Sequence, residues 1–229
     1  MSLVNAEASA GHRFAAYVSH ELRTPLATQR ALLELALGDP ETDTTVWREI
    51  GQEVLEACRQ QERTLAACLA LARAGCGAGG SRERFDLGSL VGRAIRRASP
   101  ASATVRSRLE SAHVVGDPAL VERLVDNLLA NGQRHNLAGG WVAVTTGQAG
   151  ATSLLAVENS GPRIPAGEVA KLFEPFRQYR RRGSQRTGGF GLGLAVAKAV
   201  ADAHDALITA LARQNGGLRV EVAFPAPFG

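Results

Sequence analysis

The stretch Ser19-His20-Glu21-Leu22-Arg23-Thr24-Pro25-Leu26 lies inside a helical pattern that runs from about residue 11 to residue 38. Apolar residues recur in this pattern at steps of three and four, which is typical of one buried helix face: Phe14, Val18, Leu22, Leu26, Leu33 and Ala36. Pro25 removes one helical hydrogen bond, so we expect the helix to bend just after His20. Such a bend would present the His20 side chain outward, where a second domain could reach it.

A second helical pattern follows the turn Gly38-Asp39-Pro40, with Thr44 or Thr45 as its expected N-cap. One apolar stripe runs along it, made of Trp47, Ile50, Val54, Cys58, Leu65, Leu69 and Ala72. Two amphipathic helices joined by a short loop cannot bury a core alone, so we expect a homodimer in which two hairpins over residues 11–76 form a four-helix bundle. The alternative is a hairpin that packs on its own second domain.

The composition is that of an ordinary soluble chain. Of its 229 residues, 45% are hydrophobic, 21% are charged and 5% are aromatic, which excludes collagen-like and wholly disordered chains. No apolar run reaches the length of a membrane-spanning helix, and no stretch resembles a signal peptide. The cysteines Cys58, Cys68 and Cys76 lack CxxC spacing, so we expect reduced packing residues and no metal site.

The basic residues are concentrated in one segment. The formal net charge is +4, and residues 177–186 (RQYRRRGSQR) hold five arginines and no acid. A phosphate-backbone footprint spread over the chain is therefore absent, and we expect no nucleic-acid partner. The segment directly precedes a glycine-rich stretch, which favours a polyphosphate bound nearby.

Residues 83–229 follow a glycine-rich linker at 75–80 and alternate between strand and helix patterns. We expect strands at 104–109, 141–146, 153–157, 207–211 and 218–224, and helices at 83–99, 118–136 and 192–204. The sequence thus predicts an α+β protein. Its helical hairpin over residues 11–76 is followed by a two-layer α/β sandwich over residues 83–229.

His20 has a carboxylate beside it, at Glu21. A carboxylate can hold one imidazole tautomer or accept its proton, which leaves the other ring nitrogen free as a nucleophile. The pattern of His20, Glu21, Thr24 and Pro25 resembles the H-box of sensor histidine kinases, in their dimerisation and histidine-phosphotransfer domain. This resemblance implies that His20 is the phosphoacceptor and Glu21 its acid/base partner. It also implies that Thr24 positions water when the enzyme dephosphorylates its partner.

A pair of asparagines lies in the predicted helix at 118–136. Asn127 and Asn131 are four residues apart, so they share a helix face and offer two amide oxygens, which suit Mg²⁺. A polar solvated face is the alternative, but the apolar residues around them indicate a helix buried on its other side: Leu124, Val125, Leu128 and Leu129. The segment resembles the N-box of the same family, with Asn131 as the surest magnesium ligand and Asn127 supporting it. Arg134 and His135 match positions that contact phosphate and nucleotide.

The segment Glu158-Asn159-Ser160-Gly161-Pro162-Arg163 follows a predicted strand and resembles the family's first glycine box. Asn159 stands where the family commonly has an aspartate that accepts a hydrogen bond from the adenine amino group. An asparagine can still accept through its carbonyl oxygen, but it has no charge. Arg163 replaces the second glycine, so both departures put the tightness of nucleotide binding in question.

A second glycine box, GGFGLGL at residues 188–194, follows Leu172-Phe173-Glu174-Pro175-Phe176, which resembles the family's phenylalanine box. Glycines let the backbone approach phosphates, and the helix that starts here offers free N–H groups to an anion. A dinucleotide-binding fold would place such glycines after its first strand, whereas here they occur late. The expected nucleotide-binding residues of this box are Gly189, Gly191, Gly193 and Leu194.

The motifs occur in the order of the histidine kinase core, whose ATP-binding domain belongs to the GHKL ATPases, and they cover about residues 11–225. The resemblance implies ATP and Mg²⁺ as cofactors, autophosphorylation of His20 in a homodimer, and transfer to an aspartate of a separate response regulator, with a regulator phosphatase activity. It implies a cytoplasmic location, with membrane attachment only through a sensor segment outside this chain. Two alternatives stay open: a degenerate kinase acting as a dimeric scaffold, and a GHKL-type ATPase without phosphotransfer, which would need a base such as Glu122.

Overall fold

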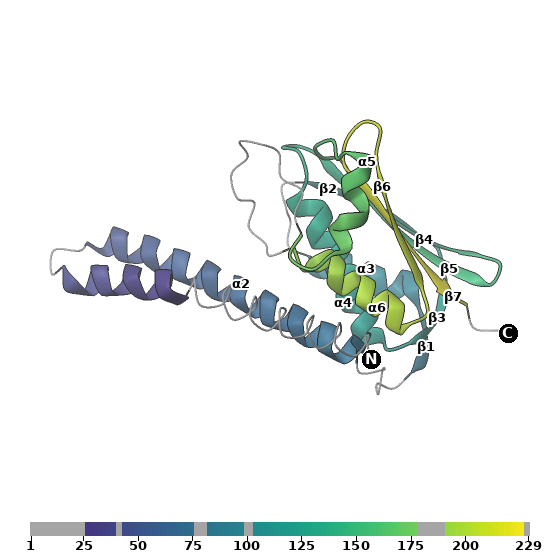
Figure 1. Cartoon of the computed structure of the whole chain (residues 1–229), viewed down its shortest axis with the longest axis horizontal. Coiled ribbons are helices and arrows are strands. Elements are labelled where there is room, and N and C mark those ends of the chain that lie inside the picture. The colour runs from purple at the N-terminus through teal and green to yellow at the C-terminus, as the bar shows by residue number, and fades with distance from the viewer. Residues whose placement is uncertain (1–25, 40–42, 76–81, 99–102, 178–190, 227–229) are drawn as a thin grey trace, which may run out of the picture. The chain divides into compact units, whose positions relative to one another are not determined.

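The fold is described from a computed structural model, and the structure describes residues 26–39, 43–75, 82–98, 103–177 and 191–226 (Figure 1). The chain divides into two units, Met1–Leu65 and Ala66–Gly229. None of the helices in the described ranges combines the length and the apolar content that a bilayer crossing requires.

The first unit contains a helical hairpin. One helix covers residues 26–38, and α2 (Thr44–Gly75) begins after the turn and continues beyond this unit. Asp43 caps α2, because its Oδ1 accepts hydrogen bonds from the N–H groups of Thr45 at 2.6 Å and Val46 at 3.0 Å. The expected cap at Thr44 or Thr45 was therefore wrong by one or two positions. The longer reach of an aspartate, placed one residue earlier, satisfies two free N–H groups at once.

The two helices of the hairpin contact each other through Gln29. Its Nε2 donates to the Val54 carbonyl oxygen at 3.5 Å and approaches Cys58 Sγ at 3.7 Å. Gln29 and Ala36 are buried, but Leu35 and Leu37 are 74% and 73% exposed. One copy of the hairpin therefore leaves large apolar side chains in solvent.

The second unit is built on a five-stranded sheet in the order β2-β4-β5-β7-β6. The pair β2–β4 is parallel and the other neighbours are antiparallel. The strands are β2 (Thr104–Leu109), β4 (Trp141–Ala149), β5 (Thr152–Asn159), β6 (Leu207–Ala212) and β7 (Leu218–Pro225). All five expected strands are present, and the register of β4 on β5 places Val142 opposite Asn159.

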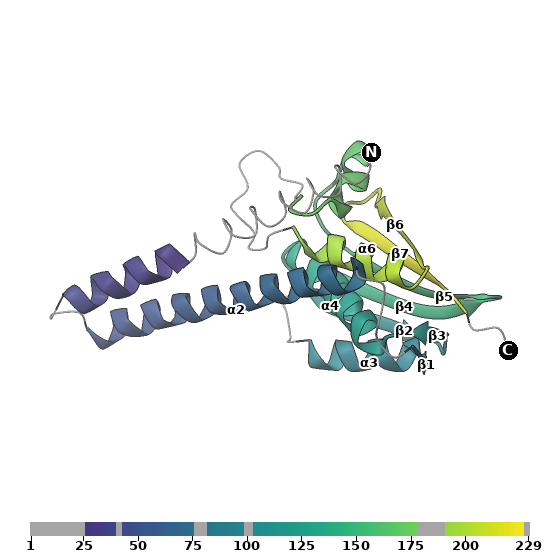
Figure 2. The same cartoon turned by 60° about the horizontal axis from the view of Figure 1, so that its bottom comes forward.

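Three helices cover one face of this sheet, as Figure 2 shows: α3 (Leu87–Arg97), α4 (Pro118–Arg134) and α6 (Gly193–Ala203). Apolar side chains of both layers form one core, which includes Leu90, Leu124, Leu128, Val142, Leu155, Val196, Val222 and Phe224. The expected two-layer α/β sandwich is therefore confirmed.

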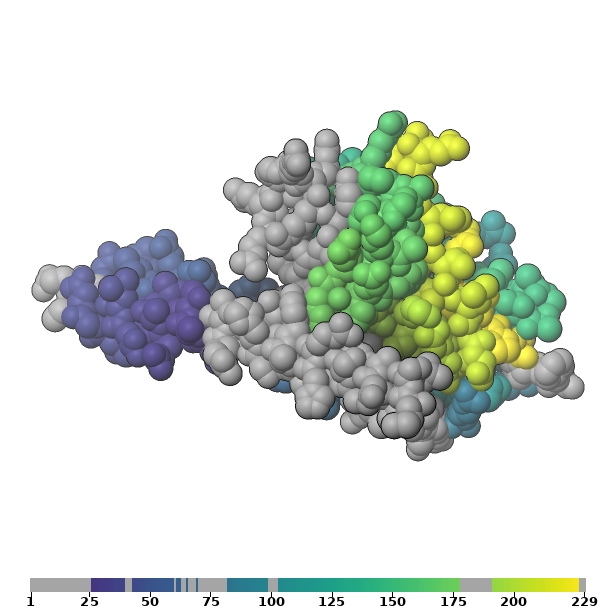
Figure 3. Space-filling model, viewed as in Figure 1, coloured from purple at the N-terminus to yellow at the C-terminus, as the bar shows by residue number. Residues whose placement is uncertain are grey.

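Short elements that the sequence pattern did not indicate complete the unit. The expected helix at 83–99 was wrong over its first four residues, because β1 (Glu83–Asp86) is a strand that pairs with β3 (His113–Gly116). Asp86 ends β1 and caps α3 by accepting from the Ser89 N–H. The short helices α5 (Ala166–Val169) and η1 (Ala170–Phe173) follow β5 and pack beside β6 and α6 (Figure 3).

Candidate functional site

Helix α4 carries the two asparagines expected to bind magnesium. Asp117 caps the helix by accepting from the Ala119 N–H at 2.8 Å and the Leu120 N–H at 3.3 Å, and Pro118 occupies the first turn. The apolar face of α4 is fully packed into the core through Leu120, Val121, Leu124, Val125, Leu128 and Leu129. Asn127 and Asn131 lie on the remaining face and are half-buried, as the spacing predicted.

The structure brings Asn127 to the second glycine box. Its Nδ2 donates to the Arg123 carbonyl oxygen at 2.9 Å, which leaves Oδ1 available as an acceptor. A Cβ at Gly193 would lie 3.4 Å from this Oδ1, so α6 begins directly beside the asparagine. The Asn131 amide makes no hydrogen bond with another residue in the described ranges. Both asparagines therefore retain an amide oxygen, the donor type that fits Mg²⁺.

The acidic residues of α4, Glu122 and Asp126, lie on the side of the helix that faces Arg97 of α3. Arg97 of α3 donates to Glu122 Oε1 at 2.6 Å and to both Asp126 carboxylate oxygens at 2.9 Å. Asp126 and Asn127 are neighbours in sequence, so their side chains leave the helix about 100° apart. Glu122, the base that an ATPase without phosphotransfer would need, is thus engaged with α3.

The C-terminal end of α4 places His135 next to the first glycine box. His135 is the C-cap residue, and its N–H donates to the Asn131 carbonyl oxygen at 3.0 Å. Burial lowers the pKa of the His135 imidazole, and the charge of the exposed Arg134 lowers it further. The imidazole is therefore neutral at pH 7 and able to contact a base or ribose without carrying a charge.

Asn159 ends β5 and is 4% exposed. Its Nδ2 donates to the Ser160 carbonyl oxygen at 2.8 Å and to the His135 carbonyl oxygen at 3.2 Å. Its Oδ1 accepts no hydrogen bond from the residues that the structure describes. A buried side chain with a fixed amide and an open carbonyl oxygen is suited to accept a hydrogen bond from a bound ligand.

Gly161 is required for the contact between the loop after β5 and the end of α4. A Cβ at this position would lie 2.5 Å from the His135 carbonyl oxygen and 2.9 Å from Asn159 Nδ2. Both distances are shorter than any ordinary carbon contact, so only glycine lets the loop after β5 approach the end of α4. The first glycine box and the N-box therefore meet through backbone atoms.

The second glycine box meets the phenylalanine box. Gly191 has φ +68°, and a Cβ there would lie 2.5 Å from the Arg177 carbonyl oxygen. The Phe176 N–H donates to the Gly191 carbonyl oxygen at 3.0 Å. Glycine is needed here for its left-handed conformation and for this close approach. The two described ends of the segment between residues 177 and 191 therefore lie side by side.

The start of α6 supplies backbone donors. Gly193 opens the helix, and its N-cap residue Leu192 makes no side-chain cap hydrogen bond within the described ranges, so the first N–H groups there have no helical acceptor. The side chain of Leu194 is buried in the core, which leaves only its backbone N–H for a phosphate. This arrangement fits an anion at the helix N-terminus.

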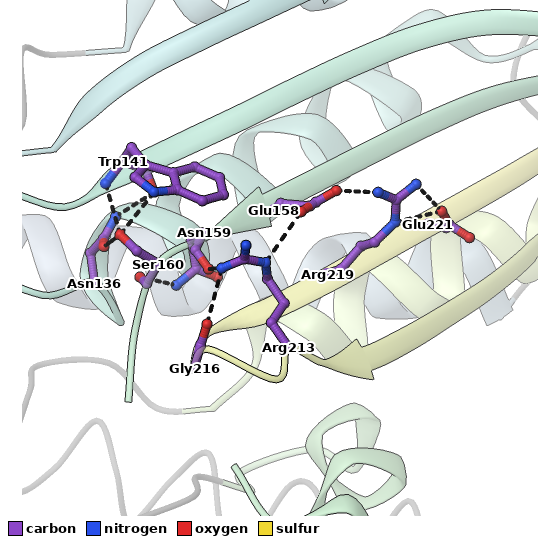
Figure 4. A network of polar contacts seen from close by, with 9 residues as sticks. All are labelled: Asn136, Trp141, Glu158, Asn159, Ser160, Arg213, Gly216, Arg219 and Glu221. Atoms are coloured by element: carbon purple, nitrogen blue, oxygen red, sulfur yellow. Dashed lines mark hydrogen bonds and ion pairs between the residues drawn. The ribbon is translucent and has the colours of Figure 1, made fainter. Parts of the chain in front are cut away.

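Four expected site residues lie outside the described ranges: His20, Glu21, Thr24 and Gly189. The structure therefore brings together Asn127 with Gly193, and His135 with Asn159 and Gly161. Sequence reasoning missed Arg213, which lies beside Asn159 on a network of polar contacts (Figure 4). The only signal for it was the Arg213-Gln214-Asn215-Gly216-Gly217 turn between two strands, which does not reveal its neighbour.

Two family models match the chain. Residues 12–77 match the His Kinase A (phospho-acceptor) domain, and residues 116–227 match the histidine kinase-, DNA gyrase B- and HSP90-like ATPase. Sensor protein CutS of Streptomyces coelicolor is 40% identical over 225 residues, which cover 95% of this chain and 53% of CutS. The signal transduction histidine-protein kinase BaeS of Escherichia coli K12 is 34% identical over 93% of this chain and 46% of BaeS.

Solved structures agree in fold. Histidine kinase ThkA, in complex with the response regulator protein TrrA, matches 97% of this chain and 64% of its own with a TM-score of 0.70 and 20% identity. The chain spans about half the length of the curated relatives it matches. The two matched domains, their order and these relatives show that the chain belongs to the sensor histidine kinase family.

Proposed function

We propose that the chain binds ATP with Mg²⁺ in its second unit, transfers the γ-phosphoryl group to His20, and passes it on to an aspartate of a response regulator. The match to an ATPase domain supports the use of ATP. One observation carries the proposal: α4 contacts both glycine boxes, through Asn127 beside Gly193 and through the His135 carbonyl oxygen bonded to Asn159. Three segments far apart in sequence thus form the wall of one nucleotide site.

Each part of the nucleotide has a candidate partner. Asn159 Oδ1 accepts a hydrogen bond from the adenine amino group, next to the close contact between Gly161 and the end of α4. The first-turn N–H groups of α6, at Gly193 and Leu194, and the Arg134 guanidinium bind the phosphates. Asn131 and Asn127 hold Mg²⁺ through their amide oxygens, and the ion, when bound, offsets negative charge on the phosphates.

The transfer itself is a displacement at phosphorus. A neutral nitrogen of the His20 imidazole attacks the γ-phosphorus, the bond from that phosphorus to the bridging β–γ oxygen breaks, and ADP leaves. Glu21, as the resemblance implies, holds the imidazole or accepts its proton. The phosphoryl group then passes from the histidine to a carboxylate oxygen of the regulator, which restores His20. In the phosphatase activity, Thr24 positions a water that attacks the phosphorus of the regulator's aspartyl phosphate, so that the bond to the carboxylate oxygen breaks and inorganic phosphate leaves.

The hairpin is proposed to form a homodimer. Leu35 and Leu37 are largely exposed in one copy, and Leu55 is also more than half exposed. Burying such side chains against a second hairpin is the ordinary way to complete a four-helix bundle. We place the chain on the cytoplasmic side, where ATP and response regulators occur. The regulator partner has support from the solved ThkA structure with TrrA.

The two alternatives make different predictions for nucleotide chemistry. An ATPase without phosphotransfer needs a free carboxylate on α4, but Arg97 engages both Glu122 and Asp126. A scaffold that does not bind ATP would not need the open acceptor of Asn159. Both observations favour the active kinase.

Incubation with γ-labelled ATP and Mg²⁺ tests the proposal. The kinase retains a label that is stable in base and labile in acid, as expected for a phosphohistidine, and His20→Gln abolishes it while nucleotide binding persists. Hydrolysis of ATP with no retained label would favour the ATPase. Failure to bind millimolar ATP in calorimetry would favour the scaffold.

A further inference from the structure

We infer that Arg213, on the turn between β6 and β7, is a positioning residue for Asn159 and so helps to select adenine nucleotides. The inference rests on the proposed nucleotide site. Arg213 directly follows β6 and is far from Asn159 in sequence. Its guanidinium nevertheless lies beside Glu158 and Asn159 of the first glycine box, at the centre of the network in Figure 4.

The turn that carries Arg213 is closed by two backbone hydrogen bonds. The Arg213 N–H donates to the Gly217 carbonyl oxygen at 3.1 Å, and the Gly216 N–H donates back to the Arg213 carbonyl oxygen at 3.0 Å. Gly216 and Gly217 have φ values of +88° and +89°, a conformation that glycine adopts without strain. The sequence of the turn therefore fixes where the Arg213 side chain starts.

The same turn packs directly on the loop after β5. The Gly217 N–H donates to the Pro162 carbonyl oxygen at 3.0 Å. A Cβ at Gly217 would overlap the Asn159 carbonyl oxygen, and one at Gly216 would overlap that of Gly161. The two glycines thus allow the turn and the loop after β5 to contact each other backbone to backbone.

The guanidinium of Arg213 links its own turn to the first glycine box and to Trp141. Its Nη1 donates to the carbonyl oxygens of Gly216 at 3.1 Å and Asn159 at 3.5 Å, and its Nε pairs with Glu158 Oε2 at 3.2 Å. It also lies over the Trp141 ring, 4.7 Å from the centroid. Since the side chain is only 24% exposed, these contacts are partly shielded from water, which strengthens them.

Trp141 holds the residue on the other side of Asn159. The Trp141 N–H donates to Ser160 Oγ at 2.8 Å, and the Ser160 N–H donates to the Trp141 carbonyl oxygen at 3.0 Å. Asn136 completes this contact by accepting from Ser160 Oγ at 2.6 Å and donating to the Trp141 carbonyl oxygen at 3.0 Å. Arg213 thus contacts the residue before Asn159, Asn159 itself, and the tryptophan that anchors the residue after it.

The backbone around Asn159 decides which side-chain atom Asn159 offers to a ligand. Its Nδ2 faces two backbone carbonyl oxygens, of Ser160 and His135. A rotated amide would place Oδ1 against both of these oxygens, which is unfavourable. The side chain therefore offers an acceptor, which pairs with the amino group at C6 of adenine and repels the oxygen at C6 of hypoxanthine or guanine. A backbone that can shift would lose this discrimination.

Arg219 provides a matched control on the same face of the sheet. It also pairs with Glu158, and additionally with Glu221, but it contacts neither the Asn159 nor the Gly216 carbonyl oxygen among the described residues. Losing Arg219 removes a partner of Glu158 but removes none of the described contacts to Asn159 or to the turn at Gly216. A difference between Arg213 and Arg219 variants therefore isolates the positioning role.

The experiment is calorimetric titration of the full chain with ATP and with inosine triphosphate, in the presence of Mg²⁺. We expect the wild-type protein to prefer ATP, and Arg213→Gln to weaken ATP binding about tenfold and to lower the ATP-to-inosine preference, because one anchoring contact of this kind is worth about a factor of ten. Arg219→Gln should change both quantities less than about twofold. Arg213→Lys, which keeps the charge but not the planar fork, should fall between them.

Thermal unfolding of each variant, without nucleotide, separates positioning from folding, and Arg213→Lys serves if Arg213→Gln is unfolded. If folded Arg213 variants keep both the ATP affinity and the preference of the wild type while Asn159→Ala loses them, the inference about Arg213 is wrong and the proposed site stands. If Asn159→Ala also binds ATP as the wild type does, the proposed adenine contact fails and the inference with it.

Discussion

Gly161 lies so close to His135 that a Cβ on the glycine would stand 2.5 Å from the His135 carbonyl oxygen. This contact joins the loop after β5 to the end of α4, and it leaves no room for any side chain. The proposed nucleotide site therefore depends on a backbone contact between two residues that are distant in sequence.

Gly161→Ala should consequently weaken ATP binding by more than about tenfold and lower the free energy of unfolding by about 1–3 kcal/mol, the usual cost of forcing a methyl group into a packed site. Gly167→Ala is the matched control, since a Cβ there meets nothing within 4 Å. Calorimetric titration and urea unfolding of both variants measure the effects. Equal ATP affinity of the two variants would show that the close approach is not needed.

Asn131→Ala should lower Mg²⁺-dependent ATP affinity by at least about tenfold, because it removes an amide oxygen proposed to hold the ion. Asp126→Asn is the control, since its side chain leaves α4 on the stripe that contacts Arg97. Titrations with ATP are compared in magnesium and in EDTA. The assignment is wrong if Asn131→Ala loses the same affinity in both conditions.

Glu122→Gln tests the alternative of an ATPase without phosphotransfer. Because Glu122 is engaged with Arg97, we expect the rate of label incorporation from γ-labelled ATP to change less than about twofold, as for a surface ion pair. Filter-bound label over time is the measurement. A loss of about a hundredfold or more in ATP turnover would instead identify Glu122 as a general base.

The pH dependence of stability should contain a contribution from Asp86. Burial acts to raise the pKa of this carboxyl group, but hydrogen bonds from Ser89, Ala112 and Ser111 outweigh it and lower the pKa from 3.8 to about 2. Since the folded pKa lies below the unfolded one, the stabilisation is present above about pH 4 and is lost as the pH falls toward 2. Allowing for solvent screening, it amounts to about 1 kcal/mol.

Asp86→Ala measures this contribution. At pH 7 the variant should unfold about 1–2 kcal/mol more easily, because α3 loses its N-cap. The difference from the wild type in urea unfolding should shrink between pH 4 and pH 2. A difference that stays constant over this range would mean that the carboxylate is not the stabilising form.

His204 should be important for the stability of the second unit. Its Nδ1 donates to the Val200 carbonyl oxygen at 2.7 Å, its Nε2 accepts from the Asp117 N–H at 3.0 Å, and its ring packs edge-on against Phe224. His204→Ala leaves a cavity and an unpaired N–H at the start of α4, for which we expect a loss of about 2–4 kcal/mol. His113→Ala is the control in urea unfolding. Equal stability of the two variants would contradict this role.

The five strands of the main sheet and helices α4 and α6 could be predicted from the sequence, because hydrophobic periodicity is a local signal. Residues 83–86 could not be predicted as a strand. Their partner, β3, lies some thirty residues later, and only the pairing makes so short a segment a strand. The Asp43 cap was missed because neighbouring threonines offer an equally plausible local signal.

The amino-acid sequence by itself determined which chemical groups this protein carries: the phosphoacceptor candidate His20, the asparagines of α4, two glycine boxes and their order along the chain. Only the tertiary structure decided that Glu122 is engaged with α3, that Asn159 offers its side-chain carbonyl oxygen, and that Arg213 contacts the Asn159 backbone. The physical reason is that residue spacing fixes which side chains share a helix or strand face. Contacts between residues distant in sequence arise only when the sheet and helices pack together.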